Sequence, residues 1–358
     1  MTGIAPQRAP GAEQSQAPMQ FDINGERLIV RRSWPGKEGE RIYECRDSLQ
    51  RIRAVKEDPE FGVKLAPYAK DRKLPSLQPG GELIVHRAGK RAVERTSQGF
   101  VKHLRAGKSA DVAAATTTMG ALAGGAGFSV PDVLETTEHS VTLSTVPGQP
   151  MMELEQDCWE LAWDEWSAAW ARMVQSDVGG SEEWQVHDAA AEADVIATWF
   201  GNVREHDPGE LADRYADRLT EVEGRIREAL LTLDEPSRGS ARSELVPAHR
   251  DLHDGQMLFD CGNRRMGLLD FDTAVLADRE LDLANLDVHV DLRVMQGLLS
   301  EDMAYVARVA IAEAARAVGA DAHRMEVYRE ATRARLVCVY AFRPQWIPVA
   351  ERLLDQLG

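Results

Sequence analysis

The feature that most constrains this fold is a change in hydrophobic pattern near residue 149 of the 358-residue chain. Before it, short alternating apolar runs separated by turn residues predict antiparallel strands. After it, apolar residues recur at helical spacing, except in two short runs, 257–259 and 266–269, which we expect to be strands. The pattern predicts an α+β chain with a β-rich N-terminal lobe and a mainly helical C-terminal lobe.

Four segments follow from this reading. Residues 1–20 are rich in Ala, Pro, Gly and Gln and predict a disordered tail. Residues 21–81 hold strand-like runs between turns and predict a β-rich cap or extension. Residues 82–148 predict the smaller lobe, and residues 149–358 the helical lobe. Within the smaller lobe we expect strands at 82–86, 91–95, 100–104, 130–134 and 140–145, and a helix over 109–124.

Composition narrows the possible partners. A net charge of −16 disfavours binding to nucleic acids and anionic membranes. We expect no membrane segment and a cytoplasmic protein, because the apolar runs are short and the N-terminus does not resemble a signal peptide. The four cysteines have no paired spacing, so we expect them to be reduced and mostly buried. Oligomeric state is not determined by these features.

Two acidic clusters carry the chemistry. The first is the stretch Pro247–Gln256, and the second, Leu269–Asp272, follows it closely. Each lies on a predicted turn beside apolar residues, so the two can place a general base and a metal-binding carboxylate around one phosphate group. That arrangement is typical of phosphoryl transfer.

These residues resemble a known family. His249-Arg250-Asp251, followed after four residues by Gln256, and then Leu269–Asp272 and Glu280–Ala284, are similar to the aminoglycoside phosphotransferase and choline kinase family. The resemblance implies a bilobal protein-kinase-like fold. It also implies Mg²⁺-dependent transfer of the γ-phosphoryl group of ATP, with GTP not distinguished, to a hydroxyl of an aminoglycoside, sugar or aminosugar.

The resemblance assigns roles residue by residue. Asp251 would be the catalytic base, and His249 would brace its loop. Asp270 and Gln256 would bind Mg²⁺, while Asp272 would reach the metal through water or cap a turn. For Asp251 and Asp270 the alternative is also a turn-capping role.

The chain departs from the family at two positions. Gln256 stands where the family mostly has Asn. In having Gln at this position the chain is similar to the maltokinase and glucosamine kinase subgroup, which carries a β-rich cap. Arg250 replaces the small residue more usual in the aminoglycoside enzymes. A nucleotide-binding pseudokinase without turnover is the alternative, motivated by Gln256 and by the absence of a helix glutamate near residues 115–116.

The smaller lobe supplies the expected nucleotide contacts. Lys102, in an alternating strand, would bind the nucleotide phosphates, with a solvent-facing lysine as the alternative. Asp111 could replace the missing helix glutamate as its partner only if the helix starts close by. The turn at Gly89 would form a flap over the phosphates, and the backbone from Ser144 to Val146 would bind the base.

The helical lobe holds two further groups. Four tryptophans at helical spacing, Trp159, Trp163, Trp166 and Trp170, predict core packing rather than a sugar platform. Asp282 is expected to fix the catalytic loop, and His253 to face the phosphates or to pack. The candidates for the acceptor pocket are Asp287, His289, Asp291, Arg293 and Tyr340–Trp346.

Overall fold

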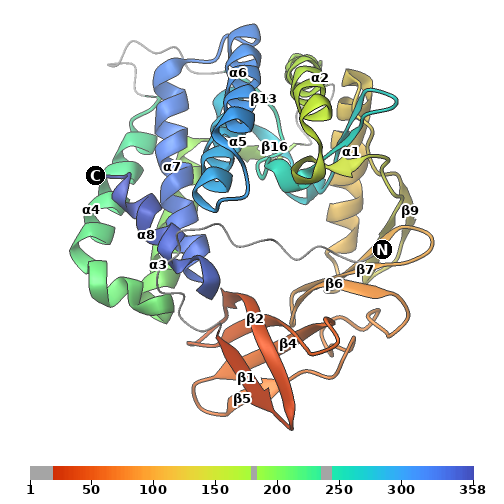
Figure 1. The fold of residues 1–358 in the computed structure, drawn as a ribbon, viewed down its shortest axis with the longest axis vertical. Coiled ribbons are helices and arrows are strands. Elements are labelled where there is room, and N and C mark those ends of the chain that lie inside the picture. The colour runs from red at the N-terminus through yellow and green to blue at the C-terminus, as the bar shows by residue number, and fades with distance from the viewer. Residues whose placement is uncertain (1–18, 179–183, 235–243) are drawn as a thin grey trace.

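The structure is a computed structural model that describes residues 19–178, 184–234 and 244–358. Most of the expected tail lies outside the described residues, and Gln20 already begins a strand. The two five-stranded antiparallel sheets lie toward one end of the molecule and most of the helices toward the other (Figure 1). The α+β organisation predicted from the pattern is confirmed, whereas the four segment boundaries stay a prediction.

The first sheet is a five-stranded antiparallel meander at the bottom of Figure 1. Asn24 and Gly25 both have positive φ, the geometry of a tight hairpin turn between its first two strands. Residues from neighbouring strands, including Val30, Tyr43 and Val55, form its own small core. Its strands are β1 (Gln20–Ile23), β2 (Glu26–Pro35), β3 (Arg41–Arg46), β4 (Ile52–Asp58) and β5 (Gly62–Leu65).

The second sheet has the order β6-β7-β8-β10-β9. Its helix, α1 (Ser109–Ala126), runs through Gly124 and Gly125, so the predicted stop at 124 was two residues early. The helix ends where Gly127 takes φ 110°, a left-handed conformation that glycine adopts without strain. The strands are β6 (Glu82–Arg87), β7 (Arg91–Arg95), β8 (Phe100–Leu104), β9 (Val133–Thr136) and β10 (Ser140–Leu143).

The first sheet contacts both other parts of the chain. The buried Glu44 carboxylate accepts hydrogen bonds from Arg32 (3.0 Å) and from the backbone N–H of His86 on β6 (3.0 Å). At the other side, the backbone N–H of Ser33 donates to the carbonyl of Phe342 at 2.7 Å. This sheet therefore connects the smaller lobe to the end of the helical lobe.

The helical lobe surrounds the largest core of the protein. All four tryptophans of the stripe are at most 1% exposed, which confirms that they pack in the core. The helices are α2 (Gln156–Val174), α3 (Ala189–His206), α4 (Leu211–Leu231), α5 (Arg279–Met295), α6 (Glu301–Ala317), α7 (Ala322–Ala341) and α8 (Ile347–Asp355).

Two small sheets lie within the helical lobe. One, with the order β11-β14-β15, contains the two expected strand runs, and the other, with the order β12-β16-β13, was not predicted. Its strands have only two to four residues, too few to show a period of two. The strands are β11 (Gln149–Pro150), β12 (Val186–His187), β13 (Leu245–Ala248), β14 (Met257–Asp260), β15 (Arg265–Leu268) and β16 (Val275–Asp278). None of the helices in the described ranges is both long and apolar enough to cross a bilayer.

The cysteines differ from expectation. Cys158 on α2 and Cys261 after β14 form a disulfide, with their Cα atoms 5.7 Å apart, so the prediction that they are reduced was wrong. They are separated by 103 residues, and only the tertiary fold brings them together. Cys45 and Cys338 are free and buried, as expected.

A thiol count tests the disulfide. Protein purified without reductant and then denatured should react with two equivalents of a thiol reagent, and with four after reduction. Cys158→Ser should raise the unreduced count to three, because it frees Cys261, whereas Cys45→Ser should lower it to one. Four reactive thiols in the unreduced wild type would contradict the structure.

Candidate active site

The catalytic loop, residues 249–256, connects β13 to β14 and is held by one carboxylate. Asp282, near the start of α5 and 1% exposed, accepts hydrogen bonds from the backbone N–H of His249 (2.6 Å) and of Arg250 (2.8 Å). Arg250 has φ 68°, an uncommon backbone conformation for a residue with a side chain. Asp282 thus fixes the loop in the way the sequence predicted.

His249 connects the two acidic turns. Its Nε2 lies 2.7 Å from the carbonyl oxygen of Leu269, and its ring packs at 5.6 Å against that of Phe271. The hydroxyl of Thr273 donates to the carbonyl of His249 at 3.0 Å. These contacts give the fully buried His249 a supporting position rather than a place beside a reacting group.

Asp251 follows in this loop with a half-buried side chain. Among the described residues, none donates a hydrogen bond to its carboxylate or forms an ion pair with it. Its backbone is constrained by the bonds to Asp282 at the two preceding residues. The carboxylate is therefore held in position while its oxygens stay available to a ligand.

The second acidic turn contacts the smaller lobe. The ammonium of Lys102, on β8, donates to Asp270 Oδ1 at 2.6 Å and to Asp272 Oδ1 at 2.5 Å. Arg91, on β7, has its Nη1 at 3.8 Å from Asp272 Oδ2. The structure thus brings together three of the predicted site residues across the two lobes, and the solvent-facing alternative for Lys102 was wrong.

The charges of this group shift its pKa values. Burial opposes ionisation of Asp270, but attraction to Lys102 and its hydrogen bond outweigh burial and lower the pKa to about 2. Burial is also the main influence on Asp272, and together with the neighbouring Asp270 charge it raises that pKa. Burial opposes the charge on Lys102, yet the two aspartates raise its pKa.

Gln256 lies beside Asp270, with its Nε2 at 3.4 Å from Asp270 Oδ2. Because the oxygen and nitrogen of an amide exchange places by a half-turn of the group, the same position offers a carbonyl oxygen. A carboxylate and an amide oxygen are the donors that Mg²⁺ prefers, and Asp272 adds a second carboxylate nearby. This donor set fits a magnesium ion.

Asp111 on α1, the expected partner of Lys102, does not pair with it. Asp111 is exposed at the start of α1 and pairs with Lys108 at 3.3 Å. The prediction that it replaces the missing glutamate was wrong, because the first turn of α1 leaves this side chain in solvent. The two aspartates of the second acidic turn provide the countercharge for Lys102 instead.

The other expected nucleotide contacts lie at two places on the smaller lobe. Gly89 is in the β6–β7 turn with φ 67°, and Asp71 and Arg105 bind its backbone. Ser144 forms two hydrogen bonds with the backbone of Asp132. Its N–H donates to the carbonyl of Asp132 at 2.9 Å, and its Oγ accepts from the N–H of Asp132 at 2.9 Å. Val146 follows in the irregular connection between β10 and β11.

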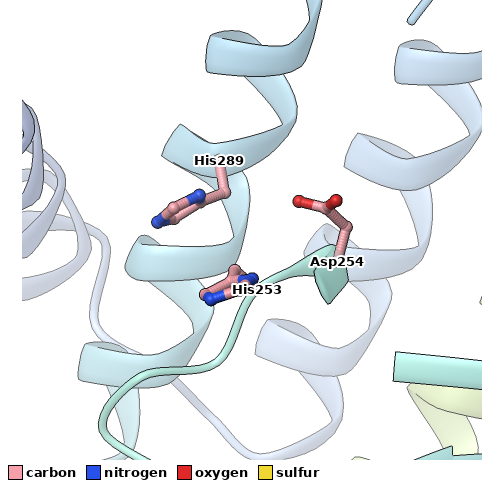
Figure 2. A group of neighbouring side chains, drawn as sticks. All are labelled: His253, Asp254 and His289. Carbon is pink, nitrogen blue, oxygen red and sulfur yellow. The ribbon is translucent and has the colours of Figure 1, made fainter. Parts of the chain in front are cut away.

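Two residues of the catalytic loop, His253 and Asp254, form a group of possible metal ligands with His289 on α5 (Figure 2). Their ligand atoms are within 4.8 Å of one another. The two rings are stacked at 25° with centroids 4.9 Å apart. Imidazole lone pairs lie in the ring plane, so stacked rings do not point at one ion. Arg293 already donates to Asp254 at 2.9 Å, which makes this group a poor cation site.

Burial sets the charge of this histidine pair. It lowers the pKa of His253 and holds the pKa of His289 well below its ordinary value, and the nearby Arg293 lowers both further. Both rings are therefore neutral near pH 7. His253 packs on His289 on α5, which favours the packing role that sequence alone left open.

The acceptor candidates separate into two sets. His289 and Arg293 contact the catalytic loop. Asp287 and Asp291 pair with arginines of the neighbouring helices, Arg329 (2.6 Å) and Arg308 (2.7 Å), and their place in an acceptor pocket stays a prediction. The segment Tyr340–Trp346 lies at the end of α7 against the first sheet, which its Gln345 contacts at 2.9 Å.

Sequence reasoning missed a buried chain of polar groups behind the loop. Asn285 Nδ2 donates to the carbonyl of Leu252 at 2.7 Å, and Arg335 donates to the amide oxygen of Asn285. Arg335 lies 3.9 Å from Glu192, whose carboxylate is 2.7 Å from His187. These residues come from four separate elements, and no spacing in the sequence signals their contact.

Comparison with known sequences identifies the family. The sequence profile of the phosphotransferase enzyme family matches residues 81–290, more than half of the chain. The chain belongs to this family. It is a small-molecule phosphotransferase, in agreement with the resemblance carried by its two acidic turns. No curated protein sequence matches the chain.

Solved structures show the same fold. Aminoglycoside 2′-phosphotransferase-IIIa is 13% identical with a TM-score of 0.51, over 76% of this chain and 90% of its own. Aminoglycoside-3′-phosphotransferase of type VIII is 19% identical with a TM-score of 0.50, over 71% and 93%. Spectinomycin phosphotransferase is 11% identical with a TM-score of 0.50, over 77% and 88%. The protein-kinase-like fold is thereby confirmed.

Asp282→Asn tests the support of the catalytic loop. An amide offers one acceptor to two backbone donors and turns its own N–H₂ toward the other. The free energy of unfolding should fall by about 1–3 kcal/mol, the cost of an unsatisfied buried group, and phosphoryl transfer should slow. Asp213→Asn, at an exposed position on α4, is the matched control for urea denaturation. Equal stability of the two variants would contradict this role.

The pH dependence of stability tests the ion pairs of Asp270. A carboxyl with a lowered pKa adds stability above its unfolded pKa, and this is lost as the pH falls through its folded pKa. With a folded pKa of about 2 and an unfolded one of about 3.9, the contribution should decline below about pH 4. The difference in unfolding free energy between wild type and Asp270→Asn should be constant from about pH 7 to 5 and then shrink. A difference that does not change with acidification would refute the lowered pKa.

Proposed function

We propose that this protein transfers the γ-phosphoryl group of ATP or GTP, with Mg²⁺, to a hydroxyl of a small molecule, an aminoglycoside, a sugar or an aminosugar. The observation that carries the proposal is Asp251. Its carboxylate has no partner among the described residues, while Asp282 holds its loop. The Lys102–Asp270–Asp272 group lies at the adjoining acidic turn.

Asp251 acts on the acceptor. Its carboxylate orients the hydroxyl and accepts the proton as the hydroxyl oxygen forms a bond to the γ-phosphorus. The bond from that phosphorus to the β–γ bridging oxygen breaks, and the nucleoside diphosphate leaves with the electron pair. Transfer then requires only that the acceptor oxygen and the γ-phosphorus are aligned, which the fixed loop favours.

The residues of the second turn act on the nucleotide. Asp270 and Gln256 would hold Mg²⁺, with Asp272 beside them, and the ion supplies positive charge that neutralises the phosphate oxygens. Lys102 would release part of its contact with the two aspartates and bind the phosphates. The Gly89 turn, which Arg105 contacts, would lie over them as a flap.

The nucleotide base would bind at the connection between the lobes. The N–H of Ser144 is occupied by Asp132, so Val146 is the better candidate of the two for reading the base through its backbone. Two of the similar proteins were solved with nucleoside diphosphates, one with GDP and one with ADP and spectinomycin. Both ATP and GTP therefore remain in the proposal.

Asp251→Asn tests the role of Asp251 as the general base. The variant should keep its affinity for Mg-ATP, because the loop backbone is held by Asp282, and should lose about 10²–10⁴-fold in the transfer rate. Release of ADP is measured over a panel of aminoglycosides, glucosamine, maltose and choline, and nucleotide affinity by calorimetry. Asp260→Asn, at a partly exposed aspartate at the end of β14 that binds Asn263, is the control. Full activity of Asp251→Asn would remove this residue from the role.

A nucleotide-binding pseudokinase is the second candidate. The observation that favours it is the exposed position of Asp111, which leaves Lys102 without a partner on α1. It predicts that Mg-ATP raises the melting temperature while no acceptor in the panel increases ADP release. Acceptor-dependent ADP release would exclude it.

A further inference from the structure

A groove runs along α3 toward the catalytic loop. It has a volume of about 470 Å³, and we call it the α3 groove. Its lining includes Asp194, Thr198 and Trp199, which recur at helical spacing on α3, and Arg250 of the catalytic loop. Arg250 directly precedes Asp251 in the chain, so the groove reaches the residue next to the proposed base.

Arg250 brings a positive charge to this groove. Its guanidinium is half-buried, and among the described residues it has no hydrogen bond or ion pair with a carboxylate. Burial is the main cause that lowers its pKa, although the group stays protonated at neutral pH. A part-buried cation without a bonded anion is unfavourable in the free protein, and an anionic ligand would compensate it.

The acidic group that acts most strongly on Arg250 already has other partners. Glu192, whose charge acts on Arg250, lies 2.7 Å from His187 and 3.9 Å from Arg335. Arg335 in turn holds Asn285, which binds the carbonyl of Leu252 in the catalytic loop. Glu192 is thus engaged by His187 and Arg335, and drawing it toward Arg250 would disturb the support of the loop.

The rest of the lining suits a carbohydrate. Trp199 packs edge-on against Phe342 with ring centroids 6.3 Å apart, and also lines the groove as a partly exposed aromatic surface. Thr198 and Asp194 are exposed there and offer oxygen atoms to hydroxyl groups. An aromatic surface combined with a few polar groups is the usual composition of a site for a polar small molecule.

Building on the function proposed above, we infer that the α3 groove is the acceptor site and that its acceptor is a carbohydrate bearing a carboxylate or a phosphate, which Arg250 binds. The sugar ring lies on Trp199, and Asp194 and Thr198 bind its hydroxyls. A polycationic aminoglycoside would bring positive charge against Arg250, so it is a poor acceptor for this chain.

Matched acceptors test the charge preference. ADP release with Mg-ATP is measured for glucuronate and glucose 6-phosphate against glucose, and for glucosamine and kanamycin as cations. We expect kcat/KM for at least one anionic sugar to exceed that for glucose by about 10- to 100-fold, the range of a charge-assisted hydrogen bond. Whichever of the two anionic sugars has the higher kcat/KM shows whether the acceptor's anionic group is a carboxylate or a phosphate.

Variants of Arg250 test the residue. Arg250→Gln should remove the preference by raising KM for the anionic sugar, while Arg250→Lys should retain part of it because it keeps the charge. Arg225→Gln, which removes an arginine from an exposed pair with Glu330, should leave the preference unchanged. Melting temperatures confirm that all three variants are folded.

Binding measured separately from turnover distinguishes the proposed phosphotransferase function from the proposed anion site at Arg250. Calorimetry with glucuronate, glucose 6-phosphate and glucose is done in the presence of ADP. If no acceptor is phosphorylated but an anionic sugar binds in preference to glucose and Arg250→Gln abolishes this, the proposed function fails and the anion site stands. If glucose or a cation is preferred, or if neither anion binds better than glucose, the anionic acceptor is wrong.

Discussion

The catalytic end of the protein depends on one buried carboxylate. Asp282 is taken out of water near the start of α5, and burial raises its pKa. Two backbone N–H groups of the catalytic loop compensate it, which ties that loop to the helix. The left-handed backbone of Arg250 is stabilised in the same contact, so Arg250 and Asp251 are presented together. Asp282 thus helps to fix the backbone position of both the proposed base, Asp251, and the proposed anion contact, Arg250.

The second constraint connects the lobes. Lys102 on β8 binds the two aspartates of the other acidic turn, although 168 residues separate it from Asp270. The first sheet adds a further link, since Ser33 binds the end of α7. The groove on α3 and the phosphate-binding groups therefore lie on parts of the molecule whose relative position is supported at two places.

Much of the candidate site could be predicted because its residues are close together in the chain. His249, Asp251 and Gln256 share one loop, and the resemblance that they carry gave the family correctly. The strands β6, β7 and β8 were also readable, since each has five or six residues bounded by turns. Predictions that required contacts between distant segments were less successful. Asp111 carries the right charge for its expected role, but its helix orients it toward Lys108.

The sequence by itself determined the order of β-rich and helical parts, the core position of the four tryptophans and the two acidic turns, because local periodicity and short motifs encode them. Only the tertiary structure decided that Cys158 pairs with Cys261, that Lys102 takes its countercharge from the other lobe and that Arg250 opens onto a groove along α3. The physical reason is that these contacts join residues far apart in the chain, and their energies depend on burial and orientation, which composition and spacing do not specify.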